Sequence, residues 1–174
     1  MAHWDLIIET NVNHLARAQN LLAQTMAERN VGLAVVSEHY YRVPDRPDWI
    51  GDTGTVAVTK GTCSSAPSIR ILERNHGFVS VSWGTLTVMG IYAPPSWPMS
   101  TFEKFLDKLR RYIAPIPSHS TLVLGDFNAK NTVWGSLRTD ARGNVIEEWA
   151  AELDLRLLNS GHTNDVSDAR ASPS

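Results

Sequence analysis

Six polar side chains of types that bind metal ions or move protons stand where apolar runs of the sequence end. They are Asn11, Asn13, Glu38, Tyr92, Asp126 and Asn128. Carboxylate and amide oxygens are hard ligands, which suit Mg²⁺ or Mn²⁺ better than zinc. A metal ion held by one or two carboxylates, with several waters kept, is the usual arrangement at phosphate-transfer sites. The pattern therefore indicates a metal-assisted site for a phosphate ester.

Each of these residues also has a structural interpretation. Asp126 and Asn128 could form a turn, because short polar side chains bond nearby backbone groups. Asn11 or Asn13 could cap the helix that follows them. Glu38 could be a solvated loop charge, and the tyrosine before "APP" could be a packing residue. Taken one at a time, the residues leave both interpretations open.

The composition is that of an ordinary globular protein of one domain. The chain has 174 residues, of which 43% are hydrophobic and 20% charged, and its formal net charge is −2. This net charge does not indicate nucleic-acid binding by the chain as a whole, so any such site must be a local patch or rely on a metal ion. Cys63 is the only cysteine, which excludes an internal disulfide and a cysteine-rich zinc site.

Nothing in the sequence resembles a targeting signal or a membrane span. The apolar stretch near the start, "DLIIET", is short and carries acids. We therefore expect a soluble intracellular protein of the nucleus or cytoplasm that has no membrane partner. The sequence does not indicate an oligomeric state.

The first half of the sequence reads as strands with one helix. Residues 5–10 and 33–36 are expected strands, and the helix between them carries an apolar stripe of Leu15, Ala18, Leu22 and Met26. "GTVAVTK", "SIRILER", "GFVSVSW" and "LTVMGIY" follow as four strand-like runs. A tight hairpin at residues 84–85 joins the last two.

The second half adds two helices around a buried strand. Ser100 and Glu103 are the expected capping box of the first helix, whose stripe comprises Phe102, Phe105, Leu106, Leu109 and Ile113. "STLVLGD" is the buried strand. A short helix with Val145, Trp149 and Leu153 in register follows, and "LRLLN" is an expected final strand. This alternation indicates an α+β layered domain, in which residues past several strand ends can meet in one crevice.

Four segments in this order, "TNVNH", "VVSEHY", "GIYAPP" and "LVLGDFNAKNTVWGS", resemble the endonuclease/exonuclease/phosphatase superfamily. "GDFNAKNTVWGS" and "TDARGNVIEEWAAELDLRLLN" are most similar to the apurinic-endonuclease-like endonuclease domain of insect non-LTR retrotransposons. The likeness runs from about Ile8 to Asn159. It implies a DNase I-like, four-layered α/β-sandwich of two packed mixed sheets flanked by helices, without its last strands. We expect an incomplete domain over residues 1–160 and a disordered tail over 161–174.

The resemblance also implies roles for the polar residues. Glu38 would be the principal ligand of Mg²⁺ or Mn²⁺, and Asn13 falls where many relatives carry a metal-binding Asp. Asn11 would contact the scissile phosphate or support the metal ligands, and Tyr92 would bond a phosphate oxygen. Asp126 would be the general base.

Asn128 would position the base and the phosphate. The residues just downstream, where relatives contact DNA, are Lys130, Asn131 and Trp134.

The resemblance weakens toward the end of the sequence. Relatives carry a "D-x-T/S" motif and finish with Ser-Asp-His. Here "DVS" (residues 165–167) and "SDA" (167–169) only approximate these motifs, with alanine in place of histidine, and His162 is badly placed to replace it. We therefore expect a metal-dependent DNA endonuclease of a non-LTR retrotransposon, fused to or derived from a reverse transcriptase polyprotein and impaired in cleavage. The alternatives are an inactive remnant that binds DNA and a phosphatase of the same superfamily.

Overall fold

The computed structural model describes residues 6–40, 46–52, 54–62 and 66–158. They form two compact units. The first comprises the chain up to residue 96 together with residues 119–127, and the second comprises residues 97–118 and those from 128 onward. The expected domain over 1–160 stays a prediction, and the tail over 161–174, with "DVS", "SDA" and His162, lies outside the described residues.

Sheet A of the first unit has four strands. They are β1 (Ile7–Asn11), β2 (Leu33–Ser37), β3 (Trp49–Gly51) and β4 (Val56–Lys60), in the order β1-β2-β4-β3. β1 runs parallel to β2, and the other pairs are antiparallel. The three-residue strand β3 was not expected, because so short a run carries no periodicity.

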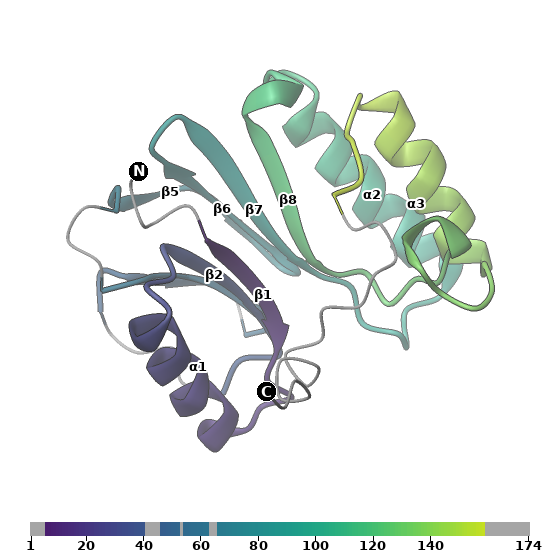
Figure 1. The fold of residues 1–174 in the computed structure, drawn as a ribbon. Helices are drawn as coiled ribbons and strands as arrows, with labels where there is room; N and C mark the ends of the chain where they lie inside the picture. The colour runs from purple at the N-terminus through teal and green to yellow at the C-terminus, as the bar shows by residue number, and fades with distance from the viewer. Residues whose placement is uncertain (1–5, 41–45, 53, 63–65, 159–174) are drawn as a thin grey trace, which may run out of the picture. The chain divides into compact units, whose positions relative to one another are not determined.

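Helix α1 (Ala16–Glu28) covers one face of sheet A (Figure 1). Leu22 and Met26 pack there against the β2 residues Ala34 and Val36. Two expectations for this helix were wrong. Leu15 is its N-cap and is 56% exposed, and no side chain caps the helix.

Sheet B has β5 (Ile69–Asn75), β6 (Phe78–Trp83), β7 (Leu86–Tyr92) and β8 (Thr121–Asp126), in sequence order. The first two pairs are antiparallel and β7 runs parallel to β8. The hairpin expected at residues 84–85 joins β6 to β7. The four successive strand-like runs divide between the two sheets, because β4 belongs to sheet A and β5 to β7 belong to sheet B.

The two sheets pack against each other through one apolar core. Its buried members include Val35 and Val58 of sheet A and Val81 and Val88 of sheet B, all 0% exposed. Fully buried strands of this kind read as apolar runs. The expected α+β fold with two packed mixed sheets is thus confirmed.

The second unit is built on helices α2 (Met99–Ile113) and α3 (Ala141–Glu152), which lie side by side (Figure 1). The expected α2 stripe is buried throughout. The capping box expected for α2 is wrong, since Pro98 is the N-cap and no side chain caps the helix. The 3₁₀ turns η1 (Ser118–Ser120) and η2 (Thr132–Trp134) complete the elements of the described chain.

Helix α3 buries a different face from the one expected. Trp149 is buried as predicted, and its Nε1 donates to the carbonyl of Leu106 at 3.0 Å. Val145 and Leu153, however, are only half-buried. The buried positions include Arg142, whose guanidinium donates to the carbonyl of Trp97 at 2.9 Å.

The final strand expected at "LRLLN" is also wrong, because residues 155–158 form no strand. No helix in the described ranges is long and apolar enough to cross a lipid bilayer.

Candidate active site

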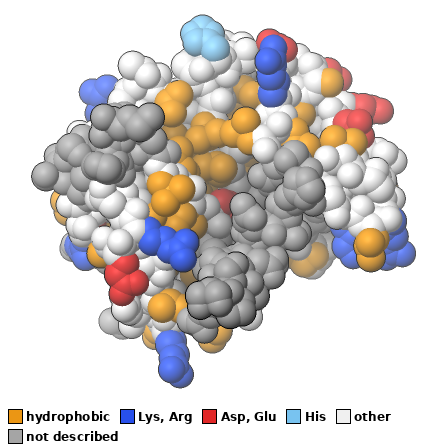
Figure 2. Space-filling model, in the orientation of Figure 1, with side chains coloured by type: hydrophobic (Ala, Val, Ile, Leu, Met, Phe, Trp, Pro, Cys, Tyr) orange, Lys and Arg blue, Asp and Glu red, His pale blue; other side chains and the backbone are white. Residues whose placement is uncertain are grey.

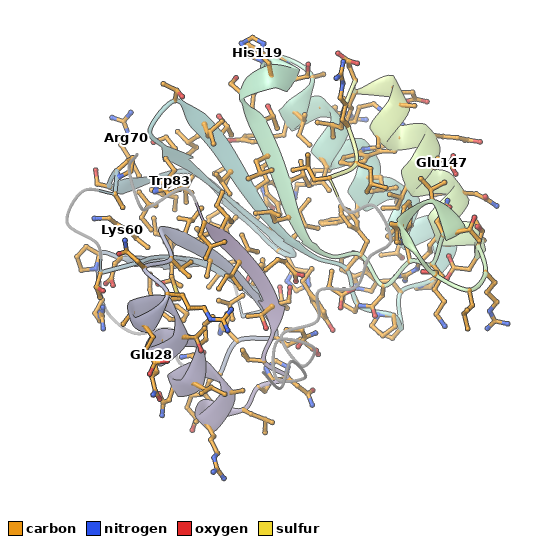
Figure 3. The ribbon with its side chains drawn as sticks, in the orientation of Figure 1. Glu28, Lys60, Arg70, Trp83, His119 and Glu147 are labelled. Atoms are coloured by element: carbon orange, nitrogen blue, oxygen red, sulfur yellow. The ribbon has the colours of Figure 1, made fainter. Side chains whose placement is uncertain are left out.

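Four of the expected site residues gather at one end of the two sheets. Asn11 ends β1 and lies beside Ser37, the last residue of β2, so Glu38 follows directly. Tyr92 ends β7 and lies beside Asp126, which ends β8. Two residues labelled in Figure 3 lie at the opposite end of the sheets. Lys60 is the last residue of β4, and His119 comes just before the start of β8.

Asn11 holds Glu38 by a direct hydrogen bond. The Nδ2 of Asn11 donates to Oε2 of Glu38 at 2.7 Å. Its Oδ1 accepts from the backbone N–H of Asn13 at 2.8 Å. The Asn11 amide therefore fixes both the carboxylate and the loop that leaves β1, so it has no part in capping α1.

The backbone of Glu38 is held in the left-handed region, with φ of 46°. Its N–H donates to the carbonyl of Thr55 at 2.6 Å, and its carbonyl accepts from His14 N–H at 2.7 Å. The Nε2 of His14 also lies 3.8 Å from Oε1 of Glu38. These contacts fix the backbone and side chain of Glu38 just beyond the end of β2.

Tyr92 joins the same group. Its hydroxyl donates to the Glu38 carboxylate, and the residue is 7% exposed. Burial, this hydrogen bond and the charges of Glu38 and Asp126 raise the pKa of Tyr92 to about 12. The phenol therefore stays protonated at neutral pH and keeps its hydrogen-bond donor in that range.

Asp126 owes its place to the glycine before it. Gly125 has φ of 139°, and a Cβ on it would lie 1.9 Å from the carbonyl oxygen of Ile91. Only glycine fits so close an approach of two strands. The "GD" at the end of β8 is therefore a close-packed strand end, and the Asp126 carbonyl accepts from Ala93 N–H at 2.9 Å.

Asp52 supports the site from behind. Its carboxylate accepts hydrogen bonds from four backbone N–H groups, of Gly54, Thr55, Val56 and Gly77, and from the Thr55 hydroxyl. The carbonyl of Thr55 accepts from Glu38 N–H, and that of Gly77 accepts from Tyr92 N–H at 2.8 Å. One half-buried carboxylate thus fixes the two backbone segments that hold Glu38 and Tyr92.

The other expected site residues are placed less tightly. Asn13 is exposed, with φ of 47°. Asn128 belongs to the second unit, two residues after Asp126 in the chain, and has φ of 49°. Asparagine tolerates this region better than most residues. The roles implied for both stay predictions.

The three residues expected to contact DNA differ in accessibility. Lys130 is exposed, and Trp134 is half-buried with its Nε1 3.4 Å from the carbonyl of Ala129. Asn131 is 1% exposed, and its amide donates to the Gly143 carbonyl and to Glu147, which Figure 3 labels on α3. The DNA contact of Asn131 stays a prediction, but its geometry favours a structural role.

Two acidic residues near the site were not singled out in the sequence. Asp52 lies in "GDTG" and reads as an ordinary turn. Glu9 lies within the strand "IIETN", and the one available signal was a charge in an otherwise apolar run. Burial, followed by the charge of Asp126, raises the pKa of Glu9 to about 7.

The donors at this end of the sheets are hard oxygens. Glu38 and Asp126 supply carboxylates, and Asn11 and Tyr92 supply groups that bond phosphate oxygens or carboxylates. The described residues contain no group of three or more His, Cys, Asp or Glu side chains able to hold a metal. The set therefore fits a cation such as Mg²⁺ that keeps most of its waters, and it does not fit zinc.

Comparison with known proteins places this arrangement in a family. Residues 86–172, half of the chain, match the sequence model described as "Endonuclease-reverse transcriptase". Two curated relatives are the RNA-directed DNA polymerases of mobile element jockey from Drosophila melanogaster and Drosophila funebris, both 24% identical. The matches cover 87% and 84% of this chain but 18% and 17% of the relatives, so the chain spans under a fifth of their length.

Solved structures share the fold. The endonuclease domain of TRAS1, a telomere-specific non-LTR retrotransposon, aligns with a TM-score of 0.76 at 24% identity, covering 88% of this chain and 75% of that one. The 3'-5' exonuclease NExo from Neisseria meningitidis aligns with a TM-score of 0.60 at 14% identity, covering 84% and 70%. At these identities the likeness establishes the DNase I-like fold.

Proposed function

Because this chain belongs to the endonuclease–reverse transcriptase family, we propose that it is a Mg²⁺- or Mn²⁺-dependent DNA endonuclease domain of a non-LTR retrotransposon. The observation that carries the proposal is the hydrogen-bonded group of Asn11, Glu38 and Tyr92, with Asp126 beside Tyr92 in the sheet. This group offers the functions that phosphodiester hydrolysis needs, namely a metal ligand, a phosphate donor and a base.

The residues would divide the work by their chemistry. Glu38 would hold the metal ion, which when bound neutralises charge on the phosphate oxygens. Tyr92, whose pKa keeps its hydroxyl protonated, would turn its one donor from Glu38 to a phosphate oxygen once Glu38 binds the metal ion. Asp126 would take a proton from the attacking water, a contribution worth about 10²–10⁴ in rate. Lys130, exposed after β8, would contact the DNA backbone.

The proposal also concerns the longer protein to which this domain would belong and the rate at which it would cleave DNA. The jockey relatives are RNA-directed DNA polymerases, which supports a link between this domain and a reverse transcriptase. We infer slow cleavage, because "SDA" only approximates the Ser-Asp-His motif and carries Ala169 in place of the histidine. The retrotransposon-like segments favour a nuclease over a phosphatase.

A supercoiled-plasmid assay tests the activity. The wild type should nick slowly with Mg²⁺ and not with EDTA, and Asp126→Ala should lower the rate at least about 10²-fold. Lys60→Ala, at the opposite end of sheet A, is the matched control and should nick like the wild type. Equal nicking by the wild type and Asp126→Ala would refute the site. DNA retardation without nicking would instead establish the non-cleaving DNA binder.

A further inference from the structure

The loop of residues 130–140, between β8 and α3, is closed at its base by hydrogen bonds. The N–H of Asp140 donates to the carbonyl of Lys130 at 2.9 Å, and the N–H of Lys130 donates to the Asp140 carboxylate at 3.1 Å. Within the loop, the N–H of Thr132 donates to the Thr139 hydroxyl at 3.1 Å. A surface loop of this length with its ends held together is an Ω-loop, a type that frequently carries function.

The base of the 130–140 loop is also fixed to α3. The Asp140 carboxylate caps this helix by accepting from Gly143 N–H at 2.8 Å. The buried amide of Asn131 donates to the Gly143 carbonyl at 3.2 Å, and its Oδ1 accepts from Val133 N–H at 2.8 Å. A Cβ on Gly143 would lie 1.8 Å from the carbonyl oxygen of Lys130, so the loop and the helix are in close contact. The loop is therefore preformed, and a ligand need not order it on binding.

Two large apolar side chains of the 130–140 loop face solvent. Leu137 is fully exposed, and Val133 is 52% exposed. Of the large apolar side chains in the described part of the chain, Leu137 is the most exposed. Apolar residues exposed singly are common on protein surfaces and need no partner. Here two of them share one loop whose base is fixed, so Leu137 is presented outward by a rigid support.

The charges of this loop suit a polyanion. Lys130 and Arg138 are exposed, and residues 129–139 contain no Asp or Glu, although the net charge of the chain is −2. At the lower right edge of Figure 2, over the loop that precedes α3, hydrophobic side chains lie next to Lys or Arg side chains. A purely apolar partner would leave both cations without anions. Duplex DNA offers phosphates to the cations and base steps to an apolar side chain.

We propose that Leu137 is an apolar wedge that enters a groove of duplex DNA and opens a base step, while Lys130 and Arg138 bind neighbouring phosphates. The choice of DNA as the partner rests on the proposed function, whereas the rigid, exposed loop is a feature of the fold. Opening a base step costs unstacking energy, and the cost is least where the step is flexible or mismatched. Leu137 therefore determines specificity, because it directs the domain to deformable sites without hydrogen bonds to the bases.

Binding of two labelled duplexes in EDTA, one fully paired and one with a single central mismatch, tests the wedge. The wild type should bind the mismatched duplex roughly fivefold or more tightly, because the mismatch lowers the cost of opening the step. In Leu137→Ala this ratio should fall to about one, since the side chain that fills the opened step is lost. Leu137→Met, which keeps a large apolar side chain, should retain the preference.

Two control variants separate the wedge from general DNA binding. Leu21→Ala removes a 56% exposed leucine from α1 and should keep the wild-type ratio. Arg138→Ala should weaken both duplexes equally and lower the slope of log affinity against log salt by roughly one, because a phosphate contact carries no base preference. Leu137 is fully exposed, so Leu137→Ala should unfold at the wild-type temperature in circular dichroism, which excludes a folding defect as the cause.

The outcomes distinguish this inference from the proposed function. Mg²⁺-dependent nicking by a chain whose affinities for the two duplexes are unchanged in Leu137→Ala would overturn the wedge and leave the endonuclease standing. A preference for the mismatch that depends on Leu137, in a chain that never nicks, would support the wedge and refute the endonuclease. Self-association that Leu137→Ala abolishes, with unchanged DNA affinities, would overturn the wedge and assign the loop to a contact between copies of this chain.

Discussion

Replacing Asp52 with alanine removes the acceptor of five hydrogen bonds at once. Four come from backbone N–H groups, with distances between 2.6 and 3.0 Å, and one comes from the Thr55 hydroxyl. A hydrogen bond to a charged group contributes about 1.5–3 kcal/mol, and a buried donor left without an acceptor costs about 1–3 kcal/mol. The Gly54 bond is exposed and water can replace it.

The other four bonds are only partly buried, so water recovers part of each. We therefore expect Asp52→Ala to lower the free energy of unfolding by about 2–4 kcal/mol, well below the sum of single bonds. Asp52→Asn keeps one acceptor oxygen but turns an NH₂ group toward two donors, so it should lose an intermediate amount. Asp48→Asn, whose partner Arg46 is exposed, is the matched control and should lose about 1 kcal/mol or less.

The loss should also depend on pH. Burial acts to raise the pKa of Asp52, but the bonds from Thr55, Val56 and Gly54 outweigh it and the net pKa lies below the ordinary 3.8. A depressed pKa gives stability that is present above the unfolded-state value and lost as the pH falls through the folded-state value. The difference between wild type and Asp52→Ala should therefore shrink below pH 3.8.

Urea unfolding followed by circular dichroism, at about pH 7 and about pH 3, measures both effects. A loss below about 0.5 kcal/mol at neutral pH, or a loss of the same size at both pH values, would refute the reasoning.

Three further predictions concern the two units separately. Glu38→Gln should abolish the binding of Mg²⁺ in calorimetry, because Glu38 is the proposed ligand and its carboxylate is held in place by Asn11 and Tyr92; unchanged binding would exclude it as the ligand. Trp149→Ala should cost roughly 3–5 kcal/mol in urea unfolding, whereas Trp149→Phe, which loses mainly the bond to Leu106, should cost about 1 kcal/mol; equal losses would contradict this. Lys130→Ala should lower the salt dependence of DNA binding by roughly one unit of slope, whereas Asn131→Ala should chiefly lower stability; the reverse pattern would make Asn131 the DNA contact.

Local signals in the sequence were enough to predict most of the strands and the polar residues at their ends. The strands β6 and β7 begin and end near the limits of their apolar runs, because burial and backbone pairing act over the same residues. The assignment of β4 to sheet A could not be predicted. It depends on pairing with β2, about twenty residues away, and nothing in "VAVTK" distinguishes one sheet from the other.

The features that could not be predicted correctly from the sequence share a physical cause. The buried face of α3 depends on Arg142, whose charge reads as solvent-facing until the carbonyl of Trp97, 45 residues away, accepts from it. Asp52 likewise reads as a turn residue, since its bond to Gly77 spans 25 residues. A polar residue is buried when partners arrive from distant segments, and a sequence shows no sign of their arrival.

The backbone at the sheet end gives a separate reason to regard it as a site. Asn13, His14 and Glu38 all have positive φ, between 46° and 56°, within one hydrogen-bonded loop pair. The left-handed region costs a residue with a Cβ roughly 1–2 kcal/mol. At Glu38, glycine would adopt this conformation at lower cost. The bonds from Glu38 to Thr55 and His14 offset that cost, and the result is a carboxylate aimed at Asn11 and Tyr92. Strain kept at a position where glycine was available indicates that the side chain itself is needed there.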